Sequence, residues 1–496
     1  MGGDVRDVAE TAAPGPADSS LRVVMFVYND CRTDARVLRE ATTLAAAGYR
    51  VTVVGRPSDL ASTEVERETR GPIMILRVPV PRPELGWLGW LRRPWRIKNW
   101  IIPRLKRPLR NFPFGLVEAA AAAGLAIVAL PFVVLLVPLA LLARRPIPPG
   151  GTVEWIIRWR LRIGAWARLA ADLAPPADVY HAHDLTALPA GVRAARANRA
   201  TLVYDSHEIF LESGANANRP RPLRAVVALD ERRWVRRAAA VVTVNDALAA
   251  ELERRYRPRR TVVVHNCPPR WQPPAERPDR IRAATGIPAD APIALYHGGF
   301  SAHRGLEELA EAILQPGLER VHAVYLGYGS LRPALDELAR DPRFAGRLHV
   351  LDAVPPDELI EWVASADVGV MAIAPSTLNH RLSTPNKLFE CLAAGTPVVV
   401  SDLPEMRRIV LGDPVGPLGE VCAPGDPVDL ARAIRAILER PPEELAALRA
   451  RCLRAAHERW NWERESAALL ELYAELATAR AQVHGVRVAP VGGGGG

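Results

Sequence analysis

Residues 22–55 read RVVMFVYNDCRTDARVLREATTLAAAGYRVTVVG, and this stretch predicts the fold. Its first seven residues are a continuous apolar run, which indicates a buried strand. A short loop leads to a helix predicted over residues 34–47, and Gly48 is a typical helix stop. A second apolar strand follows at residues 50–55. Two buried strands joined by a helix form a βαβ unit of a doubly wound α/β domain.

The same alternation continues along the chain. Cys267–Pro278 contains five prolines and predicts an interdomain linker. Before it we expect a helix at residues 223–237 and strands at residues 179–181, 202–205, 239–244 and 261–265. After it we expect strands at residues 293–297, 322–326, 348–351, 368–372 and 397–401. The predicted fold is therefore two Rossmann-like α/β domains, residues 21–270 and 279–456, that face a central cleft. Residues 1–20 are predicted to be a disordered lead-in.

Positive charge is concentrated in one segment. The chain of 496 residues has a net charge of +9, from 64 Lys and Arg against 55 Asp and Glu. Residues 81–170 hold 15 of the bases and three of the acids, which leaves 49 bases and 52 acids elsewhere. Nucleic-acid binders spread basic and aromatic side chains over a folded face. The confinement of the charge to one segment argues against a nucleic-acid partner.

That segment surrounds an apolar run. Ala119–Ala143 has no charged or hydrogen-bonding side chain, and as a helix its 25 residues could cross a bilayer. Basic residues flank both ends, and seven of the 12 tryptophans lie in the same segment. Arg and Trp beside an apolar run are typical of a membrane interface. We expect a membrane-associating insertion in the first domain, and the alternative is a long core helix with an arginine-rich outer side.

Residues 155–170 add an amphipathic pattern. One apolar face of about 100° on a helical wheel collects Trp155, Ile156, Trp159, Ile163, Trp166 and Ala170. We expect this helix to lie in the membrane interface. Because strands before and after the insertion should share one sheet, the run should dip into the bilayer and return. The expected location is the cytoplasmic face of the cell membrane, peripheral or re-entrant. No secretory signal is visible, and five widely spaced cysteines suit a reducing compartment.

Two glycine-rich turns in the second domain suggest a phosphate site. Gly298 and Gly299 follow the strand at residues 293–297, and Arg304 comes shortly after. Gly327 follows the next strand. Glycine lets the backbone approach an anion, and arginine can clamp one. Each turn alone is equally compatible with an ordinary strand-to-helix connection.

The stretch STPNKLFECLAAGTPVVV, residues 383–400, carries the strongest signal. The chain has 61 Arg and three Lys, and Lys387 is the one lysine outside the basic segment. A compact ammonium in an arginine-dominated chain indicates a phosphate contact, although chance retention is an alternative. Glu390 follows one helical turn later, so both side chains share a face. Its carboxylate is suited to ribose hydroxyls, and the alternative is a plain Lys–Glu pair within the helix.

Both halves of the chain resemble family 4 glycosyltransferases, retaining enzymes of the GT-B fold that use nucleotide sugars. The resemblance covers residues 22–476 except residues 81–170. It rests on the motifs Asp34–Glu40, Asp178–Asp184, Tyr204–Glu208, Arg304-Gly305, Gly327–Gly329 and Pro385–Glu390. It implies that residues 457–480 form a helix that crosses back to the first domain, followed by a flexible tail at residues 481–496.

The resemblance implies roles for individual residues. Glu390 matches the glutamate that holds the nucleotide ribose, and Arg304 matches the base that contacts the diphosphate. Lys387 and Asn386 match the loop around that site. His183, or alternatively His181, matches a histidine near the donor sugar that hydrogen-bonds the sugar or manages a proton.

The chain departs from the family pattern at two places. Leu382 stands where the family has the first glutamate of a pair, and a sub-group with Pro-Asn-Lys in its place is familiar. This departure leaves the residue that reads the donor sugar open. The loop at residues 29–33 lacks the usual glycines, so the acceptor cannot be inherited from the family.

We therefore expect a membrane-associated, hexosyl-transferring enzyme that needs neither metal nor cofactor. The chain has no Asp-x-Asp motif, and Arg304 and Lys387 would stabilise the leaving phosphate in place of a metal. The expected partners are a nucleotide-diphosphate sugar, a membrane surface, and a lipid, lipid-linked or cell-envelope glycan acceptor. Two alternatives stay open: a sugar-nucleotide epimerase on the same fold, and an inactive binding or scaffold homologue.

Overall fold

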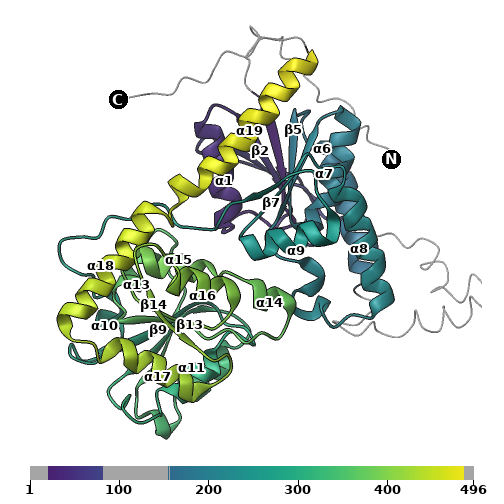
Figure 1. Cartoon of the computed structure of the whole chain (residues 1–496). Coiled ribbons are helices and arrows are strands. Elements are labelled where there is room, and N and C mark those ends of the chain that lie inside the picture. The colour runs from purple at the N-terminus through teal and green to yellow at the C-terminus, as the bar shows by residue number, and fades with distance from the viewer. Residues whose placement is uncertain (1–20, 82–154, 156, 485–496) are drawn as a thin grey trace, which may run out of the picture.

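The computed structural model describes residues 21–81, 155 and 157–484, and it contains two α/β domains, each built on a sheet (Figure 1). The first sheet has eight strands in the order β3-β4-β2-β1-β5-β6-β7-β8. Their bounds are β1 Arg22–Phe26, β2 Arg50–Gly55, β3 Glu66–Arg70, β4 Ile73–Arg77, β5 Val179–His183, β6 Thr201–Ser206, β7 Ala240–Thr243 and β8 Thr261–Val263. All neighbours are parallel except the β3–β4 pair.

Helices cover both faces of the first sheet, as expected of a doubly wound domain. One face is covered by α1 (Ala35–Ala46), whose first turn is capped by the Asp34 side chain. The other face is covered by α6 (Gly164–Leu173), α7 (Asp184–Asn198) and α8 (Arg221–Val235). The helix α9 (Asp246–Tyr256) follows β7 and packs on β8 and α8. The βαβ unit predicted from residues 22–55 is confirmed.

The second sheet has six parallel strands in the order β11-β10-β9-β12-β13-β14. Their bounds are β9 Ile293–Gly299, β10 His322–Tyr328, β11 Leu348–Asp352, β12 Val368–Met371, β13 Val398–Ser401 and β14 Gly419–Cys422. The helices around them are α10 Arg280–Thr285, α11 Leu306–Ala312, α12 Arg332–Leu338, α13 Leu359–Ala364, α14 Leu378–Leu382, α15 Asn386–Ala393, α16 Pro404–Leu411 and α17 Pro427–Leu438. The five strands expected here are confirmed.

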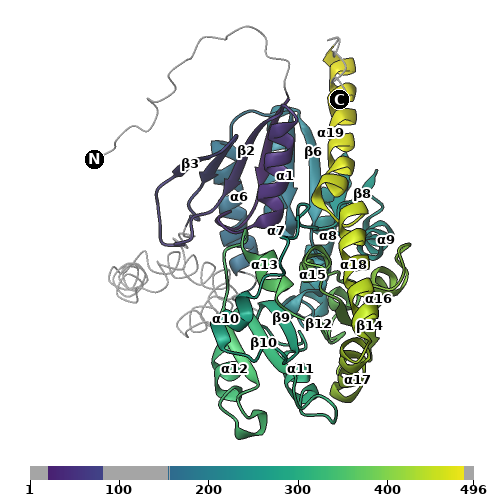
Figure 2. The same cartoon turned by 90° about the vertical axis from the view of Figure 1, so that its left-hand side faces the viewer.

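Two final helices connect the domains on one side of the molecule (Figures 1 and 2). The helix α18 (Pro442–Glu458) packs on α15 of the second domain. The helix α19 (Trp462–His484) packs on α1 and β8 of the first domain, where Tyr473 meets the ring of Tyr49. It continues four residues beyond residue 480, where the flexible tail was expected to begin. Residues 485–496, like residues 1–20, lie outside the described part of the chain.

The tryptophan-rich face predicted to lie in a membrane interface is instead part of the protein core. Ile157–Ile163 is wound as a π-helix that continues into α6. Trp155, Trp159 and Trp166 are buried in the cluster that covers the first sheet, and the indole of Trp155 donates to Asn216 Oδ1 over 2.9 Å. The interfacial-helix prediction is therefore wrong, because the sheet supplies the apolar surroundings of this face.

The remainder of the predicted insertion, including Ala119–Ala143, lies outside the described residues. Within the described ranges, no helix combines the length and the apolarity that a bilayer crossing requires.

Candidate functional site

A cleft of about 530 Å³ lies between the two domains. Its second-domain wall is formed at the carboxyl ends of β9 and β10 and at the start of α15, where ligands bind in open α/β sheets. Its first-domain wall includes Thr33, His207 and Glu208. The structure brings seven of the eight predicted site residues to this cleft: Gly298, Gly299, Arg304, Gly327, Asn386, Lys387 and Glu390. The exception is His183.

The floor of the cleft is glycine because the backbones approach closely. Gly327 pairs with Gly298 across β10 and β9. A Cβ on Gly327 would lie 2.0 Å from the carbonyl oxygen of Gly298, which leaves no room for a side chain. Gly298 itself has φ +107°, a conformation that favours glycine. The floor is therefore open backbone, as a bound diphosphate requires.

Lys387 lies above this floor on the first turn of α15. Its Nζ is 3.4 Å from the centroid of the Tyr296 ring, a cation–π contact. Burial, and secondarily the positive charge of Arg304, lower the pKa of Lys387 to about 7. A bound anion would reverse this effect, because it stabilises the charged form of the amine.

Glu390 follows Lys387 by one turn of the same helix. Its Oε2 lies 2.8 Å from Nε2 of His297, at the end of β9. Burial alone would raise the pKa of Glu390, but the hydrogen bond from His297 and the nearby cations outweigh it and lower the pKa. The carboxylate is therefore ionised at neutral pH and is oriented toward the cleft by His297.

Arg304 stands between β9 and α11, on the cleft wall. Within the described ranges it forms no ion pair. Arg304 and Lys387 thus place two cations, neither held by a salt bridge, at the glycine-lined end of the cleft. Such an arrangement is suited to a diphosphate.

His183 is placed behind the cleft. It is the last residue of β5, its side chain is fully buried, and its Nδ1 lies 3.4 Å from Asp205 Oδ2 and 3.3 Å from Nε2 of His207. His181 is also fully buried, with Nδ1 2.9 Å from the Tyr473 hydroxyl. Neither predicted histidine therefore lines the cleft.

The first-domain histidine that does line the cleft is His207, which was not predicted as a site residue. Its Nδ1 lies 3.3 Å from Asp184 and its Nε2 3.2 Å from Asp205. Burial alone would lower the pKa of His207, but these two carboxylates outweigh it and raise the pKa well above its ordinary value. His207 is therefore an imidazolium at neutral pH. The signal was available in the motif Tyr204–Glu208, which spans the end of the buried strand β6 (Thr201–Ser206).

Glu208 and Leu382 lie where the two domains meet. The Asn379 amide donates to Glu208 Oε2 over 3.3 Å, and the Asn245 amide donates to the carbonyl of Leu382 over 2.8 Å. Burial and the charge of Asp184 raise the pKa of Glu208. Leu382 stands where the family has its first glutamate, and here its backbone carbonyl makes a contact between the domains.

A buried polar cluster supports the first-domain wall. Glu40, His181, His183 and Asp205 bring ligand-type atoms within 4.8 Å of one another, a grouping that could in principle hold a metal. The guanidinium of Arg36 already lies 2.9 Å from Asp205 and 3.0 Å from Glu40. Burial, and secondarily the charge of Asp205, raise the pKa of Glu40 well above its ordinary value. With Glu40 protonated, Asp205 is the carboxylate left in the cluster, and the cations Arg36 and His207 both lie beside it.

Sequence comparisons agree with this geometry. Residues 291–440 match the family model described as glycosyl transferases group 1, and residues 133–267 match glycosyltransferase family 4. A D-inositol 3-phosphate glycosyltransferase of Xylanimonas cellulosilytica is 30% identical over 61% of this chain and 73% of its own length. A glycogen synthase of Mycobacterium tuberculosis is 28% identical over 66% of this chain and 74% of its own length.

Solved structures share the fold at low identity. A sucrose-phosphate synthase from Thermosynechococcus elongatus aligns with a TM-score of 0.64 at 18% identity, over 92% of this chain and all of its own. The Anabaena protein HepE, in complex with UDP-glucose, aligns with a TM-score of 0.57 at 14% identity over the same shares. With two parallel-sheet domains, a cleft between them and these relatives, the chain belongs to the glycosyltransferases of family 4 and group 1, enzymes of the GT-B fold.

Proposed function

We propose that the cleft binds a nucleotide-diphosphate sugar and transfers its sugar with retention of configuration, without a metal or other cofactor. The observation that carries this proposal is the placement of Arg304 and Lys387 above a glycine floor, with Glu390 one helical turn after Lys387. Neither cation is in an ion pair with a residue that the structure describes. The HepE structure, which holds UDP-glucose, supports a nucleotide sugar as the donor.

The chemistry follows from where charge develops. As the bond between the anomeric carbon and the diphosphate breaks, negative charge grows on the leaving phosphate. Arg304 and Lys387 stabilise that charge, and binding keeps Lys387 protonated. Glu390, held by His297, accepts hydrogen bonds from the ribose hydroxyls. Asn386 and the amides around Gly298 and Gly299 complete the donor site.

We assign the sugar contacts of the opposite wall to His207 rather than to His183. His207 faces the cleft, whereas His183 reaches it through His207. Both ring nitrogens of His207 lie against carboxylates, so the imidazolium acts on the donor sugar or its phosphate through its positive charge. Glu208, beside it and more basic than an ordinary carboxylate, accepts the hydrogen bond of the attacking acceptor hydroxyl.

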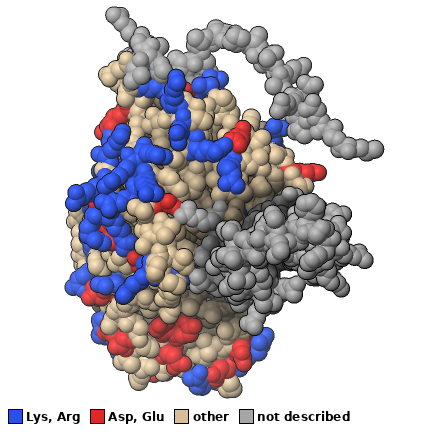
Figure 3. Space-filling view, turned by 90° about the vertical axis from the view of Figure 1, so that its right-hand side faces the viewer, with Lys and Arg blue, Asp and Glu red and all other residues tan. Residues whose placement is uncertain are grey.

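For the acceptor we propose a lipid, lipid-linked or cell-envelope glycan at the cytoplasmic membrane surface. The apolar run Ala119–Ala143 with its basic flanks supports this proposal from the sequence. A second support is an arginine-rich face on the first domain, visible in Figure 3. This arginine face consists of exposed side chains at the ends of α7 and α8: Arg193, Arg196, Arg199, Arg232, Arg233, Arg236 and Arg237. Such a face attracts anionic lipid headgroups.

A second class of acceptor, a soluble polyol or glycan, is suggested by the names of the relatives. These names refer to inositol 3-phosphate, glycogen and sucrose phosphate. The test incubates purified protein with radiolabelled nucleotide sugars and either a membrane lipid extract or the soluble fraction of the same cells. Label in the organic phase supports the lipid acceptor, and label confined to water-soluble product supports the second class. A new nucleotide sugar formed without any acceptor would indicate an epimerase, and binding without turnover would indicate a scaffold.

The matched variants are Arg304→Gln and Arg340→Gln. Both remove one guanidinium from the second domain, but Arg340 is an exposed residue after α12, outside the cleft. Turnover should fall at least about 100-fold in Arg304→Gln, the scale of losing one preorganised charge contact, and stay unchanged in Arg340→Gln. Equal turnover in the two variants would refute the site.

Membrane association is tested separately by flotation with vesicles of anionic lipid. Deletion of residues 114–146 should strongly reduce flotation. Replacing Arg232, Arg233, Arg236 and Arg237 by Gln should weaken flotation and reduce its salt dependence, because the basic residues of segment 81–170 remain. Unchanged flotation of both variants would refute the membrane proposal.

A further inference from the structure

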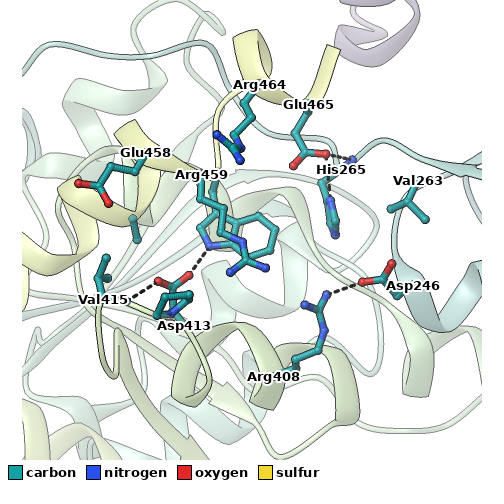
Figure 4. A pocket seen from close by; sticks show the side chains of 13 residues that line it. Asp246, Val263, His265, Arg408, Asp413, Val415, Glu458, Arg459, Arg464 and Glu465 are labelled. Carbon is teal, nitrogen blue, oxygen red and sulfur yellow. Dashed lines mark hydrogen bonds and ion pairs between the residues drawn. The ribbon is translucent and has the colours of Figure 1, made fainter. Parts of the chain in front are cut away.

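A second cavity, of about 520 Å³, lies on the hinge side of the molecule, where the chain passes between the domains (Figure 4). Both domains line it. The first domain contributes Asp246 of α9 and the chain around Val263 and His265, and the second contributes Arg408 of α16, the loop at residues 413–415 and the junction of α18 and α19. None of its lining residues lines the donor cleft. It is therefore a separate cavity, to which the proposed transfer reaction assigns no role.

Two guanidinium groups on its wall lack acidic partners. Arg459 lies 4.8 Å from the ring centroid of Trp460, and Arg464 is exposed at the start of α19. Neither forms an ion pair with any residue that the structure describes. Figure 4 shows both side chains on the same side of the cavity. Two free guanidinium groups on one wall are suited to an oxyanion, which accepts paired N–H donors.

The acidic side chains of the lining do not satisfy these cations. Asp246 pairs with Arg408 across the domains over 3.1 Å. Asp413 accepts from the Trp460 indole over 2.8 Å, and Glu465 accepts from the backbone and the ring of His265. The remaining acid, Glu458, is exposed, and in Figure 4 its carboxylate points away from both free arginines.

His265 lines the same cavity and is held in place by its neighbours. Its side chain is 9% exposed, and its Nδ1 lies 3.0 Å from Glu465 Oε2. Its Nε2 is buried without a hydrogen-bond partner. The ring lines the cavity and packs edge-on against Phe389 and Trp460, so it cannot turn this nitrogen toward solvent without breaking those contacts. The ring is therefore a fixed part of the cavity wall, and its buried Nε2 does not face a ligand in the cavity.

We propose that this hinge cavity is a second binding site, which takes a small phosphomonoester. The phosphate oxygens accept from the guanidinium groups of Arg459 and Arg464. Because residues of both domains line the cavity, a bound ligand adds a link between the domains. Binding should therefore raise the melting temperature.

The test uses glycerol 3-phosphate as the probe and glycerol as its uncharged counterpart, at constant ionic strength. The donor cleft also attracts phosphate, so the titration is done in the Arg304→Gln background, which removes the main cation of that cleft. Calorimetry and thermal shift should both show saturable binding of glycerol 3-phosphate, and glycerol should produce neither signal.

Adding Arg464→Gln should weaken this binding at least about tenfold, the scale of one charged hydrogen-bonding group. Adding Arg340→Gln removes the same charge elsewhere and should change nothing. Arg464 is exposed, so its replacement preserves folding, which circular dichroism checks. No binding in the Arg304→Gln background, or equal affinity in the Arg464 and Arg340 variants, would overturn the proposal. Neither outcome bears on the proposed donor site, because nucleotide-sugar binding to that cleft is measured separately in the wild-type protein.

Discussion

The lowered pKa of Lys387 predicts that donor binding depends on pH and takes up a proton. In the free enzyme this amine has a pKa of about 7. Beside a diphosphate the pKa should return toward the ordinary value of about 10.4. The free site therefore loses its charge as the pH rises through 7, while the bound site keeps it. Affinity should fall with rising pH.

The size of the effect follows from the two pKa values. Between pH 6.5 and 8.5 the dissociation constant of a nucleotide sugar should rise about 25-fold, or ~1.9 kcal/mol. At pH 7.5 about three quarters of the free enzyme has a neutral Lys387, so binding should take up about 0.75 proton. Calorimetry in two buffers of different ionisation enthalpy measures that uptake directly.

The matched control is Lys387→Arg, whose side chain stays charged across this range. On donor binding, residue 387 of this variant should take up no proton. The dissociation constant of the donor should therefore change little between pH 6.5 and 8.5. Any uptake that remains in this variant belongs to other titratable groups. Equal proton uptake in the wild type and in Lys387→Arg would refute the reasoning.

Three further predictions follow from the described contacts. Glu390→Gln should weaken donor binding by about 1.5–3 kcal/mol in calorimetry because it removes the ribose acceptor, while Glu307→Gln, on exposed α11 surface, should not. Gly327→Ala should cost about 1–3 kcal/mol in denaturant unfolding, because its Cβ would lie 2.0 Å from a carbonyl, whereas Gly164→Ala in α6 should be tolerated. Trp166→Ala should lower the free energy of unfolding by about 3–5 kcal/mol in denaturant unfolding, because it empties a buried site. Arg168→Ala, at an exposed position of the same helix, should lower it by less than about 0.5 kcal/mol. Equal small effects of the two variants would contradict the core position of Trp166.

Most of the buried parallel strands were predictable, because an apolar run between polar loops is typical of such a strand, but the parallel strands β4 and β14 were not predicted. Strand β3 escaped prediction because its residues, Glu66–Arg70, are mostly charged and pair only with β4 at the sheet edge. The tryptophan face of residues 155–170 was identified correctly as apolar but placed wrongly. Periodicity shows that a helix has an apolar face, but it does not show whether protein or lipid covers that face.

The second-domain half of the site was predictable from local sequence. Lys387 and Glu390 share one helical turn, and Gly298 and Gly327 end adjacent strands, so their spacing already places them together. The first-domain half was not. His183 ends β5 and His207 follows β6, and whether each side chain faces the cleft or the core depends on how the strands and α7 pack. Sequence spacing does not carry that information.

The most direct test of the central claim is a crystal structure of the protein soaked with the nucleotide sugar that binds best in a thermal-shift screen. The account predicts the diphosphate between Arg304 and Lys387, above Gly298 and Gly327, with the ribose hydroxyls on Glu390. A nucleotide bound elsewhere, or a diphosphate turned away from both cations, would contradict it.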